Sequence, residues 1–419
     1  MSATPCYADI IKLRRQLHKT AETAFNEWHT FHLLQEIFRK QDVEIRYIQS
    51  QTVAAHRSMI PTECIHPEED PQIPGMLVTL RLHEKNSTHP CHAAIRCDLD
   101  GLPVQESTSS QHLPQKEGFV SPNGCMHACG HDGHMAIATC TFLYFIEHRR
   151  ELVHTPYHSI SLLFQPAEEG CRGAVVIRDS RLLDDIDELW CFHLGMGLPS
   201  GTVAPAPSGF LSTEKFNLCF KGRKAHAGHP ELGINALQPL CTTIAGTLAL
   251  ADRNLGRYIN FSNVRCDGAR NIIPDLACCE GELRARDLKE LKALKSEFFK
   301  ELEKTQAIPL PEQHSEPDRL YYSYTVMGAA APIKQSAELV KKVEKTALSL
   351  GLKCRDFDFN ASEDASVLID YVQSRGGRGC YFVIGADIKA PHHSPLFDFD
   401  EQSLITGYRL LSVLIGLHI

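Results

Sequence analysis

The run 126–134, Met-His-Ala-Cys-Gly-His-Asp-Gly-His, concentrates side chains that bind metal ions. Cys129 and His131 are ligands that suit Zn²⁺, Mn²⁺ or similar ions, and Gly130 between them allows a tight backbone turn. Ordinary loop residues would be one alternative. A redox pair of Cys125 and Cys129 would be another, although the spacing is not Cys-x-x-Cys. Because three His and two Cys fall within ten residues, we expect metal ligation.

Carboxylates follow two apolar segments that predict buried strands. Asp98 and Asp100 end the first, and Glu168 and Glu169 follow the second. Catalytic groups in open α/β sheets collect at the carboxyl ends of the strands. Of two adjacent carboxylates, one can bind metal while its neighbour moves protons. A solvated turn at 98–100 and a helix-capping role for the glutamates stay open as alternatives.

Two further histidines lie far from this run in the sequence. His193 follows the apolar residues 189–192, and His393 stands in Pro-His-His-Ser-Pro. Each histidine alone is more typical of a buried, hydrogen-bonded core residue than of a ligand. Together the clusters supply Cys, His, Glu, His and His, the ligand count that two adjacent transition-metal ions need. Such a site can polarise a carbonyl group for hydrolysis.

The elements that must position these side chains alternate between strands and helices. Strands are expected at 76–81, 92–97 and 159–165, one helix at 8–40 and another at 132–149, which favours an α/β sheet covered by helices. The pattern of expected strands and helices changes at the turn-rich segment 204–209. Beyond it, a β-α-β-β-α order predicts a compact α+β insertion, and after the Pro-rich stretch 308–317 the chain returns to the first domain.

Composition excludes several classes of protein. The net charge of −8 argues against nucleic-acid binding. The sequence contains no run of 18 apolar residues, so we expect no membrane span. The 16 cysteines are scattered, and the first residues contain no apolar signal core. We therefore expect a cytoplasmic protein with free thiols.

The motifs as a set resemble those of the aminoacylase and carboxypeptidase-type metal amidohydrolases. This family includes hydrolases of auxin-amino-acid conjugates, hippurate and p-aminobenzoyl-glutamate. The run 126–134 occurs in the expected order with Gln-Pro-Ala-Glu-Glu-Gly at 165–170 and Ala-His-Ala-Gly-His-Pro at 225–230. The resemblance covers nearly the whole chain. It implies an α/β fold, with a mixed-sheet catalytic domain at 1–211 and 328–419 and an inserted α+β lid and dimerisation domain at 212–327.

The resemblance also implies a role for each residue of the centre. Glu168 would be the general base that activates water and later protonates the leaving amine. Asp98 and Asp100 would orient ligands without binding metal themselves. Two divalent ions, Mn²⁺ or Zn²⁺, would be held by Cys129, His131, Glu169, His193 and His393.

The resemblance assigns three residues of the insertion to substrate. His226 would reach the active site, from a partner subunit, and stabilise the oxyanion. Asn271 would help to hold substrate, and Arg284, on an expected strand, is a candidate for binding the substrate carboxylate. The substrate would be a small N-acyl or N-aroyl amino acid, and the assembly a homodimer or hetero-oligomer formed through the insertion.

The sequence departs from the family pattern in two places. Ala21 stands where relatives have Pro, which affects only helix termination. Residues 361–365 read Ala-Ser-Glu-Asp-Ala where many relatives have Gly-Ser-Glu-Asp-Phe, and this version resembles the p-aminobenzoyl-glutamate branch. A broad N-acyl-amino-acid hydrolase or dipeptidase is the alternative. An inactive binding protein of the same fold is disfavoured because every implied ligand and Glu168 are present.

Overall fold

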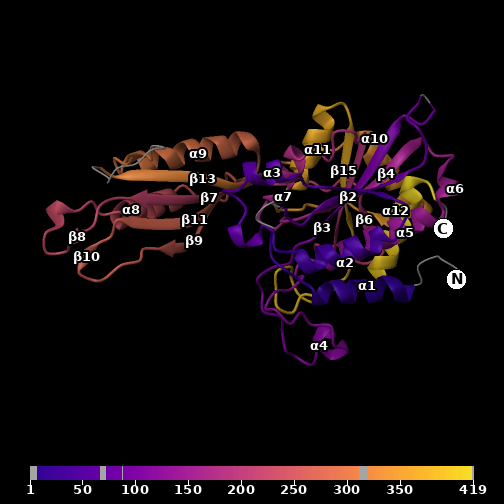
Figure 1. Ribbon diagram of the computed structural model, residues 1–419, viewed down its shortest axis with the longest axis horizontal. Coiled ribbons are helices and arrows are strands. Elements are labelled where there is room, and N and C mark those ends of the chain that lie inside the picture. The colour runs from indigo at the N-terminus through magenta and orange to yellow at the C-terminus, as the bar shows by residue number, and fades with distance from the viewer. Residues whose placement is uncertain (1–6, 67–71, 87, 311–318, 418–419) are drawn as a thin grey trace. The chain divides into compact units, whose positions relative to one another are not determined.

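The chain folds into two compact units (Figure 1). The computed structural model describes residues 7–66, 72–86, 88–310 and 319–417. Unit 1 comprises Met1–Ser208, Ile333–Phe359 and Asp364–Ile419, and unit 2 comprises Gly209–Pro332 and Asn360–Glu363.

Unit 1 is built on an eight-stranded mixed sheet with the order β1-β2-β4-β3-β5-β15-β6-β14. The central strands β4, β3, β5 and β15 are parallel. Strands β1 and β2 pair antiparallel with their neighbours, whereas β6 is antiparallel to β15 and parallel to β14. The central strands are apolar and almost wholly buried, as expected for strands covered on both faces. The strands are β1 (Glu44–Tyr47), β2 (Met76–Arg81), β3 (Cys91–Asp98), β4 (Tyr157–Gln165), β5 (Glu188–Leu194), β6 (Thr202–Ala204), β14 (Lys353–Cys354) and β15 (Arg378–Ile384).

Helices cover both faces of this sheet (Figure 1). Alternate strand residues such as Ile95 and Phe192 join one hydrophobic core with α1, α2, α5, α10 and α12, whereas α7 and α11 pack together on the opposite face. The helices are α1 (Tyr7–Lys19), α2 (Trp28–Arg39), α3 (Ser50–Ala55), α4 (Leu113–Glu117), α5 (His131–Glu147), α6 (Arg149–Leu152), α7 (Gly173–Asp179), α10 (Ala337–Ser349), α11 (Ala365–Ser374) and α12 (Gln402–Ile415), with a 3₁₀ turn at Thr62–Cys64.

The expectation of one helix over 8–40 is wrong. The chain leaves the helical conformation between α1 and α2, over residues 20–27. The carboxylate of Glu22 accepts hydrogen bonds from the backbone N–H groups of His29 and Thr30, so it satisfies donors at the start of α2. The strands expected at 76–81, 92–97 and 159–165 and the helix at 132–149 are present, with ends that differ by up to two residues.

Unit 2 is an α+β sandwich of one sheet and two helices. Its five-stranded sheet has the order β12-β13-β7-β11-β9, and Phe216, Leu294 and Phe298 form part of the core between the sheet and the helices. A separate two-stranded ribbon pairs β8 with β10. The elements are β7 (Ser212–Lys221), β8 (Ala225–His226), a 3₁₀ turn (Pro230–Leu232), α8 (Leu237–Leu248), β9 (Arg257–Arg265), β10 (Ile272–Ile273), β11 (Leu276–Ala285), α9 (Leu288–Glu303), β12 (Ile308–Pro309) and β13 (Tyr321–Ala330).

Strand β13 is not among the elements expected from the sequence. This ten-residue strand pairs antiparallel with β7 and parallel with β12, the edge strand of the sheet. It follows the Pro-rich stretch expected at 308–317, of which residues 311–317 lie outside the described residues.

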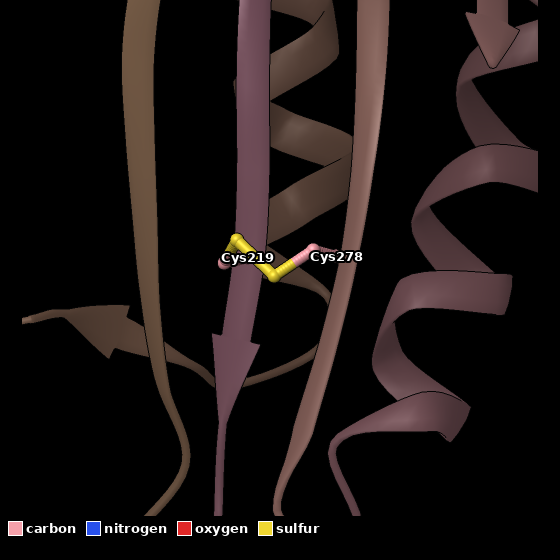
Figure 2. Close-up of a disulfide and its surroundings, with 2 residues drawn as sticks. All are labelled: Cys219 and Cys278. Carbon is pink, nitrogen blue, oxygen red and sulfur yellow. A yellow bond between two sulfur atoms is a disulfide. The ribbon is translucent and has the colours of Figure 1, made fainter. Parts of the chain in front are cut away.

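A disulfide joins neighbouring strands of unit 2 (Figure 2). Cys219 on β7 and Cys278 on β11 stand directly opposite each other in the antiparallel register, with their Cα atoms 4.1 Å apart. Side chains at such positions face one another. The expectation of free thiols is therefore wrong for this pair, and no other disulfide forms among the described residues.

The two mixed sheets and their helices confirm the expected α/β class. Among the helices that the structure describes, none is both long enough and apolar enough to span a bilayer.

Candidate metal centre

The predicted ligands, general base and orienting carboxylates of unit 1 gather at the carboxyl edge of the parallel strands. Asp98 is the last residue of β3, His193 lies near the end of β5, and Glu168 and Glu169 follow β4 directly. His131 is the first residue of α5, which packs against β3, β4 and β5. Parallel strands bring their carboxyl ends to a single edge, so residues remote in the sequence meet there.

Two groups of possible ligand atoms share the thiol of Cys129. One contains His131 and His193, the other contains Glu169 and His393, and within each group the ligand atoms lie within 4.8 Å of one another. The Sγ atom of Cys129 is 3.5 Å from Nε2 of His193. Two three-residue groups with a common sulfur match the arrangement that two neighbouring ions require.

The histidines of the first group are oriented by backbone carbonyls. Nδ1 of His193 lies 2.8 Å from the carbonyl oxygen of Leu194, and Nδ1 of His131 lies 2.7 Å from that of Asp100. Each Nδ1 must carry the proton to donate to a carbonyl, so the Nε2 lone pair is available for a metal ion. Nε2 of His131 is buried and has no hydrogen-bond partner among the described residues.

His134 is held differently, which argues against ligation. Its Nδ1 lies 2.7 Å from Oδ1 of Asp98, and its Nε2 accepts the backbone N–H of Leu194 at 2.9 Å. Its two ring nitrogens are therefore engaged. His134 fixes the end of β5 to β3 through α5, although it lies close enough to Asp98 and His131 to form a possible ligand group.

The charge balance of the centre favours bound cations. Burial, with Glu169 and Glu168 close by, raises the pKa of Cys129 well above its ordinary value. Burial alone would lower the pKa of His131, but Asp98, Asp100 and Cys129 raise it well above the usual range. Burial and the neighbouring His134 and other histidines keep the pKa of His193 low. A thiol, acidic groups and the neutral imidazole of His193 thus lie around His131, and this soft and hard donor set fits divalent transition-metal ions.

The turn that follows β4 gives Glu168 and Glu169 different contacts. The backbone N–H of Glu169 donates to Oδ2 of Asp100 at 3.0 Å. Glu168 is 8% exposed, and its Oε2 lies 3.9 Å from Nε2 of His131. Glu169 belongs to the group around Cys129 and His393, whereas Glu168 is absent from both Cys129 groups. This arrangement suits one carboxylate as ligand and its neighbour as base.

His393 approaches from the long loop between β15 and α12. Its backbone N–H donates to the carbonyl oxygen of Ala128, and its Nε2 lies 3.5 Å from Oε1 of Glu169. The residue adopts a φ of 65°, in the left-handed region that non-glycine residues rarely occupy. Such backbone conformations concentrate at functional sites.

A buried network of charged side chains lies beside the centre, and the sequence did not predict it. The guanidinium of Arg96 donates to Gln165, Asp98 and Asp364 at 2.8, 2.8 and 3.1 Å. The second oxygen of Asp364 accepts the backbone N–H of Ala174. Arg96 and Asp364 belong to motifs noted in the sequence, but only the fold brings residues that far apart in the chain together.

Burial alone would raise the pKa of Asp98. His131, His134 and Arg96 more than offset that effect and hold the pKa of Asp98 well below its ordinary value. Asp98 is therefore a permanent anion that accepts hydrogen bonds beside the ligands.

His226 and Asn271 lie together in unit 2. Ile272 pairs with His226 in the ribbon of β8 and β10, and the carbonyl oxygen of Asn271 accepts the N–H of Ala227. His226 is exposed, and its Nδ1 accepts the N–H of Gly228 at 3.0 Å. The neutral ring must then carry its proton on Nε2, which leaves that nitrogen as a donor.

Arg284 occupies a different part of unit 2. It lies on β11, and its guanidinium donates to Oε1 of Glu282 at 2.8 Å, with 28% of the side chain exposed. A substrate carboxylate would have to share this guanidinium with Glu282.

Residues 94–416 match the profile of Peptidase family M20/M25/M40, which spans more than half of the chain. The chain belongs to this family. It is a metal-dependent amidohydrolase, and the resemblance predicted from the motifs is confirmed.

Individual relatives agree with this assignment. The chain is 37% identical to a Haemophilus influenzae homolog of one of the subunits of p-aminobenzoyl-glutamate hydrolase, covering 77% of this chain and 74% of that protein. It is 29% identical to the indole-3-acetyl-aspartic acid hydrolase of Enterobacter agglomerans, covering 97% and 94%. The fold is similar to that of the aminobenzoyl-glutamate utilization protein from Klebsiella pneumoniae, with a TM-score of 0.71, 22% identity and coverage of 97% and 95%.

Removal of the Arg96 guanidinium should destabilise unit 1 strongly. Arg96→Met leaves Asp98 and Asp364 as buried carboxylates without their cation, and we expect a loss of about 3–5 kcal/mol in the free energy of unfolding. Urea denaturation measures this loss. The control is Arg81→Met, because the ion pair of Arg81 with Glu44 is 60% and 52% exposed and should contribute less than about 1 kcal/mol. Equal losses in the two variants would contradict the interpretation.

Proposed function

We propose that this chain hydrolyses the amide bond between an acyl or aroyl group and an amino acid, with p-aminobenzoyl-glutamate as substrate and p-aminobenzoate and glutamate as products. The two ligand groups that share Cys129, with Glu168 beside them, are the observation that carries the hydrolytic chemistry. The substrate rests on the 37% identity to the Haemophilus influenzae protein.

Two divalent ions, Mn²⁺ or Zn²⁺, fit the donor set of Cys129, His131, Glu169, His193 and His393. When bound, they would supply Lewis-acid polarisation of the scissile carbonyl and a water of lowered pKa.

Glu168 performs the proton transfers in this proposal. Its carboxylate takes a proton from the attacking water and returns it to the leaving amine, so that the amide C–N bond breaks as the free amine forms. Its burial beside His131 supports the role, because the base is then held close to the ligands and away from bulk water. Asp100 orients His131 through its backbone carbonyl oxygen, and Asp98 supports the centre through its hydrogen bond from His134.

Unit 2 supplies groups for the substrate. His226, reaching the site from a partner subunit, donates from Nε2 to the oxyanion that forms on the scissile carbonyl, a role that its ring orientation supports. Asn271, next to it in the ribbon, and Arg284 would bind the amino-acid half of the substrate.

The assembly is proposed to form through unit 2. Strand β9 ends the order of its sheet, and Tyr258 and Val264 on it are exposed apolar residues. Edge strands of this kind pair readily with another chain. A homodimer or a hetero-oligomer fits, and relatives whose names describe them as one subunit of a hydrolase support the second. A cytoplasmic location is also proposed, since most described cysteines are not in disulfides.

A broader N-acyl-amino-acid hydrolase is the second candidate. The relative from Enterobacter agglomerans, which is named for indole-3-acetyl-aspartic acid, favours it because the similarity covers almost the whole chain. Measurement of kcat/KM for p-aminobenzoyl-glutamate, hippurate and acetylated amino acids separates the candidates. We expect p-aminobenzoyl-glutamate to be preferred, and a preference for another substrate would contradict the narrower proposal.

Glu168 and Glu169 should respond differently to the same substitution. Glu168→Ala should retain metal and lower kcat by about 10²–10⁴-fold, the usual contribution of a general base. Glu169→Ala, the matched control in the adjacent position, should lose metal because a ligand is removed. Metal content by elemental analysis and kcat with the preferred substrate test this difference. Metal loss in Glu168→Ala would show that its role is ligation.

His226→Ala should lower kcat by about 10²–10³-fold, the cost of removing one oxyanion donor, and leave the metal content unchanged. The control is His229→Ala, three residues further on, where the side chain is 68% exposed. That variant should behave as the unsubstituted protein. If His226→Ala also released metal, the assignment of this residue to the oxyanion would be wrong.

A further inference from the structure

A buried carboxyl group outside the predicted site contacts the turn that carries Glu168 and Glu169. Glu27, which immediately precedes α2, is fully buried. Its Oε1 accepts the backbone N–H of Ala167 at 2.8 Å. Its side chain makes no capping hydrogen bond to α2. The start of α2 therefore does not account for the burial of this acid.

The turn needs such support because its backbone is unusual. Ala167 adopts a φ of 54°, in the left-handed region that is unfavourable for a residue with a Cβ atom. Its N–H is held by Glu27, and the N–H of Glu169 is held by Asp100. Glu168 lies between these two fixed points, so the direction of its side chain depends on both.

We propose that Glu27 is a positioning residue, whose carboxyl oxygen holds the N–H of Ala167 and thereby sets the orientation of Glu168 and Glu169. The naming of Glu168 as base rests on the proposed function. The contact of Glu27 with the turn does not.

The protonation state of Glu27 sharpens the proposal. Burial, and then the nearby carboxylate of Asp100, raise the pKa of Glu27 well above its ordinary value. A carboxyl group whose pKa is raised in this way keeps its proton at neutral pH. Glu27 thus acts as a neutral hydrogen-bond acceptor. Glutamine has the same length and offers a carbonyl oxygen, whereas leucine has a similar volume and offers none.

The experiment compares Glu27→Gln and Glu27→Leu in the full chain. We expect Glu27→Gln to keep kcat within about threefold of the unsubstituted protein. Glu27→Leu should lower kcat, and weaken Zn²⁺ affinity measured by competition with a chromogenic chelator, each by about 10–100-fold, as is usual when a group that orients ligands is lost. KM should change little, because substrate contacts are not altered. Rescue by glutamine distinguishes positioning from simple filling of space.

Glu22→Ala is the matched control. Glu22 is also buried and lies five residues earlier, but its carboxylate binds the N–H groups of His29 and Thr30 rather than the turn. This variant should lower the thermal midpoint and leave kcat and Zn²⁺ affinity unchanged.

Three results would overturn the inference. They are full kcat and Zn²⁺ affinity in Glu27→Leu, equal losses in Glu27→Gln and Glu27→Leu, and a loss of kcat in Glu22→Ala as large as in Glu27→Leu. If Glu27→Leu does not fold, Glu27→Asp replaces it. Its carboxyl group is withdrawn by one methylene from Ala167, and kcat should fall while Glu27→Gln stays active. If the unsubstituted protein hydrolyses no acyl amino acid, the proposed function fails, and the Zn²⁺ affinities alone decide the role of Glu27.

Discussion

The carboxylate of Asp98 accepts a hydrogen bond from Arg96 with one oxygen and from His134 with the other. Through Arg96 it is linked to Gln165 and Asp364, and through His134 to the end of β5. An anion that is completely buried would be very costly without these partners. The need to compensate it ties strands β3, β4 and β5 and the start of α11 into one arrangement, on which the ligand positions depend.

The need for hydrogen-bond partners also explains why proposed ligands and the residues that hold them in place lie close together in the sequence. Asp98 faces the charge network, while the carbonyl and carboxylate of Asp100 contact His131 and Glu169. His131 begins α5, and His134, one turn later, returns to Asp98. The segment at 131–134 therefore supplies one proposed ligand and one scaffold residue, and the segment at 98–100 supplies hydrogen bonds to both. Rigid supports of this kind keep ligands in place before a metal ion binds.

The sequence was sufficient to predict the structure where residues with a chemical role lie next to a clear secondary-structure pattern. The motif at 126–134 and the apolar runs before Asp98 and Glu168 identified the strands, the helix and the family. It was insufficient where a distant contact decides the structure. The break between α1 and α2 depends on Glu22 reaching forward to cap α2, and an uninterrupted apolar periodicity conceals it. The pairing of Cys219 with Cys278 depends on the register of β7 and β11, which is set by the whole sheet. The contact between Glu27 and Ala167 joins positions 140 residues apart.

The membership of Cys129 in both ligand groups has a consequence for oxidation of the centre. Because one sulfur atom belongs to both candidate ligand groups, the two proposed ions would not be chemically independent. Oxidation of that sulfur to a sulfinic or sulfonic acid would remove a soft donor from each position in a single event. Under the proposed function, an oxidant that acts on Cys129 would therefore inactivate each molecule in one event.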